Sequence, residues 1–489
     1  MKAVLLSGAI ASLLLLLGRV SGFIREAFIA AKYGASGEAD SIIILLTTPD
    51  VLVNLLVGGA FSVALIPAFN RLSQLDAKYL YGEFSLLTFV FFLIVTLILI
   101  GFSDVLLYWL LPGGGGNSEL LLAFQVSLLA VPFCALSGVS GAYLHFKNRF
   151  AVVAGGTLIF NFFVIFGLMT LEVNVSLLVG VPLVLIVAAL ARWGVQVVDS
   201  RTIPFVINRQ NILISSKLLK TYLYAVLSGG LLFTLPVILR SIASMEGEGN
   251  LSLLNYAIKL VDLPIGVLIS IFSVAFLPRL AVSFVDEARE DYLQMINSLI
   301  FMALACTVTV CVVVFFSSRE IVGIVYDWGS LTSSNLEVIE GYFSIFLMTI
   351  PFQVLNAVLV SVLASRGDTL RPLLIISMGV VSFLICALFL ELNTSNLLLG
   401  SLFLFALITF SLFYILAIKH ECLLFAQRKY IFEMIKLSLM LVLCSVFSFI
   451  VSLVLSGVAH LIVVMLTGLV CLFLFTLKSR ELRAFIGQK

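Results

Sequence analysis

Four cationic side chains lie within strongly apolar stretches of this 489-residue chain: Arg19, Arg25, Arg240 and Lys259. An ionisable group surrounded by hydrocarbon is costly unless it faces a cavity or a partner, so each of these side chains needs one or the other. Four carboxylates accompany the cations in the same stretches: Glu26, Asp40, Asp50 and Asp262. The combination predicts a polar chamber with excess positive charge inside an apolar protein, which binds or passes an anionic substrate.

The alternative for these charges is a set of internal ion pairs, because four acids could neutralise four bases. Lys259 and Asp262 are three residues apart, which makes them neighbours on one helix face and a pair that could be purely structural. Glu26 follows Arg19 by seven residues and should face nearly the same way, whereas Arg25 should point to another face. Arg19 and Arg25 are the strongest candidates for substrate contact, since arginine offers bidentate contacts to phosphate.

The composition predicts an all-α integral membrane protein. Hydrophobic residues make up 62% of the chain and charged residues 11%, with a mean hydropathy of +1.22. Soluble domains carry roughly 25% charged residues, so no sizeable soluble domain is expected. The net charge of +2 does not indicate a nucleic-acid partner, and the three histidines are far apart in the sequence. We expect no metal and no cofactor, and we assign His145, His420 and His460 no ligand role.

Breaks at Gly, Pro, Asn and charge clusters divide the chain into fourteen expected membrane helices. Their ranges are 3–31, 40–70, 82–111, 119–145, 151–171, 175–198, 217–245, 251–280, 292–317, 337–364, 370–391, 396–418, 431–456 and 459–478. With a cytoplasmic N-terminus, 22 of the 28 Lys and Arg residues fall on the cytoplasmic side, two fall outside, and the other four are the cations within helices. The positive-inside rule therefore predicts that both termini are cytoplasmic.

An internal repeat relates the two halves of the chain. The segment from Phe61 to Pro67 (FSVALIP) recurs from Phe272 to Pro278 (FSVAFLP), with five identities in seven positions and an offset of 211 residues. Both copies lie late in an expected helix that runs inward, so the halves are parallel repeats. Parallel repeats of transporters place the substrate path on their pseudo-twofold axis. A chance match between apolar segments is the alternative.

Three motifs carry a resemblance to a known family. The first runs from Gly18 to Ala27 (GRVSGFIREA) and continues with Asp40, Asp50 and the segment to Pro67. The second runs from Tyr256 to Pro264 (YAIKLVDLP), and the third from Ser365 to Pro372 (SRGDTLRP). With fourteen helices, the chain resembles over its full length the MurJ/MviN family of lipid II flippases, within the multidrug/oligosaccharidyl-lipid/polysaccharide exporter superfamily.

The resemblance implies two six-helix lobes, 1–200 and 201–420, around a cationic cavity, with two further helices in 421–489 forming an apolar groove for a polyprenyl tail. It implies functional roles for Arg19, Arg25, Glu26 and Asp40. From their place in apolar helices we expect the other four charges to bind substrate as well: Asp50, Arg240, Lys259 and Asp262. Three departures concern the charge of the cavity. The family often has an arginine where Val53 stands and a basic residue near Thr47, and its Arg–Glu pair in the eighth helix is here Lys259 and Asp262.

The expected function is that of a flippase, not an enzyme, which moves a polyprenyl-pyrophosphate-linked saccharide across the bacterial inner membrane by alternating access. Lipid II, for peptidoglycan synthesis, is the leading substrate, and an undecaprenyl-linked exopolysaccharide or O-antigen unit is the nearest alternative. An ion-coupled drug exporter is disfavoured by the two extra helices and the cationic bias. A membrane glycosyltransferase or polymerase is disfavoured because no large outward loop carries catalytic carboxylates. We expect a monomer that contacts its lipid-linked substrate and membrane lipids. Transport would be driven either by a coupling ion or by the membrane potential. If the ion is a proton, Asp40, Asp50 and Asp262 are the candidate carriers.

Overall fold

The computed structural model describes most of the chain. The described residues are 2–56, 60–112, 117–171, 177–207, 212–230, 234–285, 289–365, 368, 370–389, 393–419 and 428–479. Their secondary structure is entirely helical, and the chain forms two compact units, residues 1–255 and 256–489. The boundary between these units lies inside one helix, α12 (Asn250–Val285), whereas the expected lobe boundary at 200/201 remains a prediction.

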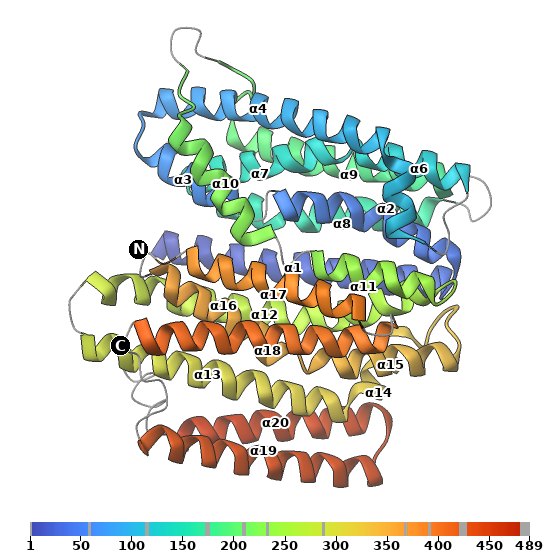
Figure 1. Cartoon of the computed structure of the whole chain (residues 1–489), viewed down its shortest axis with the longest axis vertical. Helices are drawn as coiled ribbons and strands as arrows, with labels where there is room; N and C mark the ends of the chain where they lie inside the picture. The colour runs from blue at the N-terminus through green and yellow to red at the C-terminus, as the bar shows by residue number, and fades with distance from the viewer. Residues whose placement is uncertain are drawn as a thin grey trace. The chain divides into compact units, whose positions relative to one another are not determined.

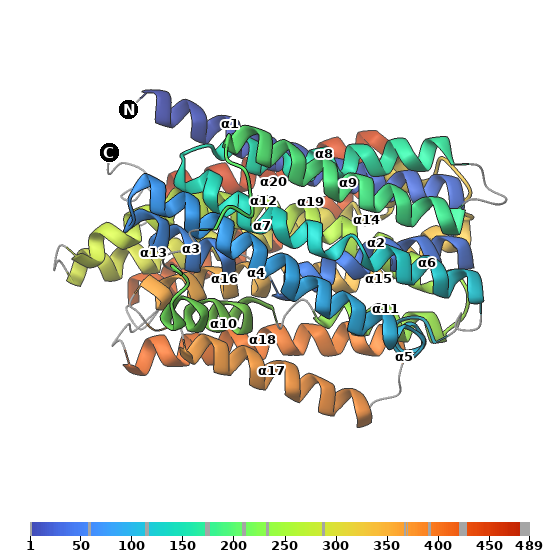
Figure 2. The ribbon, with the colours of Figure 1, turned by 90° about the horizontal axis from the view of Figure 1, so that it is seen from above.

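The first unit contains α1 to α11 and the beginning of α12 (Figure 1). Helix α1 packs along α8, and α8 packs on α9, as Figure 2 also shows. Helix α7 packs against α3, α4 and α9. The bounds are α1 Lys2–Tyr33, α2 Gly37–Leu56, α3 Ala60–Asn70, α4 Gln74–Gly101, α5 Ser103–Leu110, α6 Ser118–Leu128, α7 Val131–Phe146, α8 Phe150–Thr170, α9 Leu177–Ser200, α10 Ser216–Gly230 and α11 Thr234–Met245.

The second unit contains the rest of α12 and α13 to α20. Helix α13 packs against α16 and against the pair α19 and α20, which lie side by side in Figure 1. Helices α17 and α18 form a second pair, and α18 also packs against α16. The bounds are α13 Arg289–Phe316, α14 Ser318–Tyr326, α15 Ser333–Leu347, α16 Ile350–Ser365, α17 Leu370–Phe389, α18 Thr394–Lys419, α19 Arg428–Val454 and α20 Gly457–Lys478.

Among the described residues, ten helical segments are long and apolar enough to cross a membrane. The part of α1 from residue 10 onward is not among them, because it carries Arg19, Arg25 and Glu26 close together. Large apolar side chains are exposed along many helices, for example Phe403 and Phe410 on α18, which are 74% and 68% exposed. An apolar surface of this extent fits a lipid surrounding rather than water. The chain is therefore an all-helical, multi-pass membrane protein.

The expected helix ranges are almost entirely helical in their described parts, but three of them comprise two helices each. These are the pairs α4 and α5, α6 and α7, and α15 and α16. Helix α2 contains Pro49 and continues through it. The hydroxyls of Thr47 and Thr48 donate to the carbonyls of Ile43 and Ile44, at 2.6 and 2.8 Å, so they need no cavity.

Two features of the second unit lie outside the cation-bearing helices. Residues 318–336, between two expected spans, contain α14, which packs against α15 and α20. His460 of α20 was expected to be isolated, yet its Nδ1 lies 2.8 Å from Oε1 of Glu320 on α14. His460 is 1% exposed, so this pair joins the last helix to α14 inside the protein. Sequence spacing could not show it, because 140 residues separate the partners.

Candidate functional site

Arg25 and Glu26 form a buried ion pair on α1. Arg25 Nη2 lies 2.8 Å from Glu26 Oε1, and the two residues are only 5% and 1% exposed. The helical spacing had placed Arg25 on another face from Glu26. That expectation treated the side chains as rigid, whereas the long arginine side chain folds back to its neighbour along the chain.

Asn161 of α8 holds the other end of the Arg25 guanidinium group. Its Oδ1 accepts from Arg25 Nη1 at 3.0 Å, and its Nδ2 donates to Ser21 Oγ at 3.0 Å and to the Gly18 carbonyl at 3.3 Å. The close approach of α1 and α8 depends on two glycines of α1. A Cβ on Gly18 would lie 3.3 Å from Thr157 Cβ, and one on Gly22 would lie 3.3 Å from Asn161 Nδ2. Larger residues at these two positions would push Asn161 away from Arg25.

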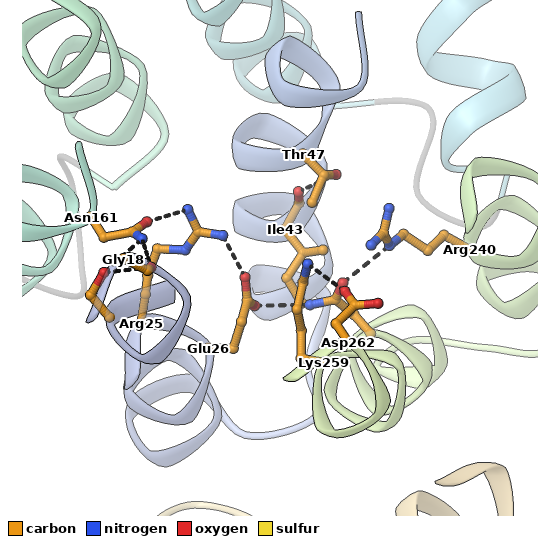
Figure 3. Close-up of polar contacts among 11 residues, drawn as sticks. Gly18, Arg25, Glu26, Ile43, Thr47, Asn161, Arg240, Lys259 and Asp262 are labelled. Carbon is orange, nitrogen blue, oxygen red and sulfur yellow. Dashed lines mark hydrogen bonds and ion pairs between the residues drawn. The ribbon is translucent and has the colours of Figure 1, made fainter. Parts of the chain in front are cut away.

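Asn255 of α12 connects Glu26 to a second arginine. Its Nδ2 donates to Glu26 Oε2 at 2.9 Å, and its Oδ1 accepts from Arg240 Nε of α11 at 3.1 Å. Asn255 is 0% exposed and Arg240 is 5% exposed. Figure 3 shows the complete series of contacts, with Asn161 and Arg240 at its two ends. We call these five side chains the relay: Asn161, Arg25, Glu26, Asn255 and Arg240.

The relay carries more positive than negative charge. One carboxylate, Glu26, faces two guanidinium groups, Arg25 directly and Arg240 through the neutral amide of Asn255. Asp50 of α2 acts on Arg25 through space, by electrostatic attraction. Arg25 Nε is buried and has no hydrogen-bond partner among the described residues. A buried donor without an acceptor is rare, and a buried guanidinium N–H of this kind suits an oxyanion.

Asp40 was expected in the substrate site. It is buried, and it also accepts hydrogen bonds from the backbone of another helix. Its two oxygens accept the backbone N–H groups of Gly249 and Ser252, both at 2.8 Å, and the residue is 3% exposed. Helix α12 begins at Asn250, so this carboxylate caps its N-terminus. Asp40 therefore joins the start of α2 to the start of α12, and it brings Asn255, about one turn further along α12, beside α1.

Asp40→Ala should destabilise the protein by about 2 kcal/mol, because two buried N–H groups lose a charged acceptor. The thermal unfolding midpoint of the purified protein in detergent measures this. Glu38→Ala is the matched control, since Glu38 is an exposed acid in the same first turn of α2. Equal midpoints for the two variants would show that the cap does not hold these helices together.

Other expected site residues are not among the five side chains of the relay. Arg19 is exposed on α1 rather than buried. Lys259 and Asp262 pair with each other as their spacing predicted, with 3.1 Å between Nζ and Oδ2, and their side chains are 25% and 50% exposed. The part that these eight residues play in substrate binding stays a prediction. The structure links Arg25, Glu26 and Arg240, uses Asp40 as a helix cap, and pairs Lys259 with Asp262.

Sequence analysis missed both asparagines of the relay. Each is an amide in an apolar helix, and a buried amide needs a partner just as a buried charge does. That signal was present in the sequence, but it does not identify the partner. Asn161 bonds to a residue 136 positions away, and Asn255 bonds to one 229 positions away.

Comparison with known proteins identifies the family. The family model described as lipid II flippase MurJ matches residues 29–473. The chain belongs to the MurJ family of lipid II flippases. Members of this family are membrane transporters rather than enzymes, and they serve peptidoglycan synthesis. Among the 489 residues, the match includes Asp40, Arg240 and the Lys259–Asp262 pair, whereas Arg25 and Glu26 lie just before its first residue.

Similar proteins support this assignment across most of the chain. The probable lipid II flippase MurJ of Rickettsia prowazekii is 26% identical over 392 residues, which cover 77% of this chain and 76% of that protein. The Rhizobium tropici protein of the same description is 25% identical over 377 residues, 73% of this chain and 69% of that protein.

Solved structures show the same fold. A lipid II flippase MurJ in an inward closed conformation has a TM-score of 0.75 at 18% identity, covering 97% of this chain and 99% of that one. An inward-facing MATE family transporter of the MOP superfamily has a TM-score of 0.61 at 13% identity, covering 81% and 92%. At these identities the likeness shows the MurJ and MATE fold alone.

Proposed function

We propose that this chain translocates lipid II, a saccharide linked to a polyprenyl pyrophosphate, across the bacterial inner membrane by alternating access. One observation supports this most directly. Inside apolar helices, the relay holds two guanidinium groups around one carboxylate and leaves a buried N–H of Arg25 without a partner among the described residues. An anionic pyrophosphate is the part of such a lipid that this arrangement favours.

The proposed architecture has fourteen membrane helices, as two six-helix lobes of residues 1–200 and 201–420, followed by two further helices. The helical ranges support this count, since the described part of each expected span is almost entirely helical. The repeated segment supports the pseudo-symmetry, with its first copy in α3 and its second in α12. Substrate would then move as the lobes rock about a site near the membrane midplane.

The polyprenyl tail has a candidate site on the last two helices. An apolar groove of about 660 Å³ lies between α19 and α20, and its lining includes Phe447, Ile450, Leu466 and Val470. Aliphatic and aromatic walls of this kind suit a hydrocarbon chain. We propose that the tail lies in this groove while the pyrophosphate meets the cations, with the protein acting as a monomer among membrane lipids.

Growth rescue tests the substrate. Expressed in a host depleted of its own lipid II flippase, the chain should restore growth, because without lipid II at the outer face no peptidoglycan is made. A second host that lacks its O-antigen flippase tests the nearest alternative. Rescue of O-antigen display without rescue of growth would reassign the substrate to an undecaprenyl-linked polysaccharide unit, and rescue of neither would refute the proposal.

The orientation is a separate proposal, with both termini cytoplasmic and Gly115 periplasmic. It is supported by the distribution of Lys and Arg between the two sides, although residues 113–116 lie outside the described residues. In a variant without the seven native cysteines, Gly115→Cys should react with a membrane-impermeant maleimide in intact cells. Lys147→Cys should react only after the cells are opened. The reverse pattern would overturn the orientation.

A further inference from the structure

The chain between α9 and α10 is fixed to the first unit. Its described residues, 201–207 and 212–215, form no helix, and we call them the linker. Lys147, just after the end of α7, donates from Nζ to the hydroxyl of Thr202 at 3.1 Å, and Thr202 is 6% exposed. One face of the linker is therefore held against the protein.

The linker meets α4 where that helix changes from polar to apolar. The carbonyl oxygen of Val206 lies so close to Gly82 that a Cβ there would be 2.0 Å from it. Glu83, which is 5% exposed, accepts the backbone N–H of Leu213 at 2.8 Å. From residue 84 to residue 101, α4 carries no charged side chain. Because irregular backbone is not tolerated against hydrocarbon, this contact fits the membrane interface, where the lipid head groups begin.

The other face of the linker exposes apolar side chains. Ile203 and Ile212 are 73% and 80% exposed, and Ile207 is 41% exposed. Val198, in the last turn of α9, is 77% exposed. The three isoleucines are not part of a membrane-spanning helix, so a transmembrane lipid face does not explain their exposure. At the interface they fit the acyl chains just below the head groups.

Three basic residues flank these isoleucines: Arg201, Lys217 and Lys220. All three are exposed, Arg201 at the start of the linker and the two lysines in the first turns of α10. The acid next to them in the sequence, Asp199, is paired with Arg149. Basic side chains beside an apolar surface at the membrane boundary are the pattern that binds anionic lipid.

We propose that the linker anchors the chain to the membrane surface by binding anionic phospholipid. The three isoleucines would lie among the acyl chains, and the three basic side chains would contact lipid phosphates. The partner is the leaflet at the end of the first unit where α7 and α9 end, which is cytoplasmic in the proposed orientation. This role does not depend on which lipid is translocated, and it holds the segment between the two proposed lobes at the membrane.

Quenching by brominated lipids measures this contact. A variant without the seven native cysteines carries a bimane dye at Ile207→Cys. It is reconstituted into vesicles of phosphatidylcholine and phosphatidylglycerol, in which one lipid or the other is brominated in its acyl chains. Both lipids should quench the dye, and phosphatidylglycerol should be preferred about tenfold or more, because each basic residue near an anionic surface contributes about fivefold.

Two double variants separate charge from apolar contact. Lys217→Gln with Lys220→Gln should lower the preference for phosphatidylglycerol about tenfold, while phosphatidylcholine still quenches. Ile203→Ser with Ile212→Ser should reduce quenching by either lipid. Arg319→Gln is the matched control, since it removes a positive charge from an exposed arginine of α14 and should change neither quantity. All these positions are exposed, so each variant should keep the unfolding midpoint of the dye-labelled parent.

Each contrary result overturns the proposal. A dye that neither brominated lipid quenches would show that the linker does not reach the acyl chains. Equal quenching by both lipids, unchanged in the lysine variant, would refute binding of anionic lipid. If the dye were shielded from lipid in native membranes and the same position cross-linked to a second protein, the surface would serve a protein partner. Growth rescue by the chain is measured separately, so failure of the anchor is distinguishable from failure of the proposed flippase function.

Discussion

Arg25→Ala is expected to abolish transport, with a loss of about 100-fold or more, while the protein still inserts into the membrane. Removing one partner of a buried charge pair between a protein and its ligand, here Arg25 and the pyrophosphate, costs roughly 2–5 kcal/mol of binding, and the lower part of that range already corresponds to this loss. In this protein the change also removes the donor that faces Glu26 Oε1 and Asn161 Oδ1. Growth rescue in the flippase-depleted host measures transport, and immunoblotting of membranes measures insertion.

A neutral pair separates substrate binding from folding. Arg25→Met combined with Glu26→Gln removes both charges, leaves an acceptor for Asn255 Nδ2, and should regain much of the stability that Arg25→Ala loses. It should nevertheless remain inactive, because the cation that meets the pyrophosphate is gone. Transport by this variant at normal expression would show that the pair serves only the fold.

Conservative replacement provides a further test at the same residue. Arg25→Lys keeps the charge, but an ammonium group cannot reproduce the flat guanidinium fork that reaches Asn161 and Glu26 together. It should therefore be impaired as well.

Arg19→Ala should also abolish transport, since Arg19 is a cation exposed on the same helix. Full activity of both alanine variants would reduce the two arginines to structural roles.

The helices could be predicted from the sequence because their signal is local. The range expected as 151–171 is α8, Phe150–Thr170, and the one expected as 251–280 begins with α12 at Asn250. Apolar runs bounded by polar loops determine such limits. The division of the expected 119–145 span into α6 and α7 was missed, because its apolar composition continues across Leu129 and Ala130. Composition shows that a segment crosses the membrane but not where its helix is interrupted.

The site could be predicted only in part, because charge is visible in a sequence and pairing is not. Arg25, Glu26 and Arg240 stand out in apolar surroundings, and they are indeed buried. Their connection through Asn161 and Asn255 depends on which helices pack together, and α1 packs on α8 through glycines whose effect needs three dimensions. The contacts of Asp40 could not be predicted from the sequence either. Its burial was expected, but its role as the cap of α12 depends on a contact 209 residues away.

Exchanging Lys259 and Asp262 decides whether that pair is structural or binds substrate. In the double variant Lys259→Asp with Asp262→Lys, the residues stay three apart on one face of α12, so an ion pair can form again. If pairing were the whole role, the double variant should regain what either single change loses. If Lys259 contacts the pyrophosphate, the exchange moves the cation by about 4.5 Å along the helix, and transport should stay at least about tenfold reduced.

We expect the second result. The Lys259 side chain is 25% exposed and that of Asp262 is 50% exposed, so the pair is open to a ligand in a way that the buried Arg25–Glu26 pair is not. An ion pair this exposed contributes little to stability, which makes a purely structural role a poor reason for placing two charges in an apolar helix. The double variant should accordingly show a normal unfolding midpoint together with lost transport. Near wild-type transport at normal expression would refute this role for Lys259 and leave Arg19 and the relay as the expected anion contacts.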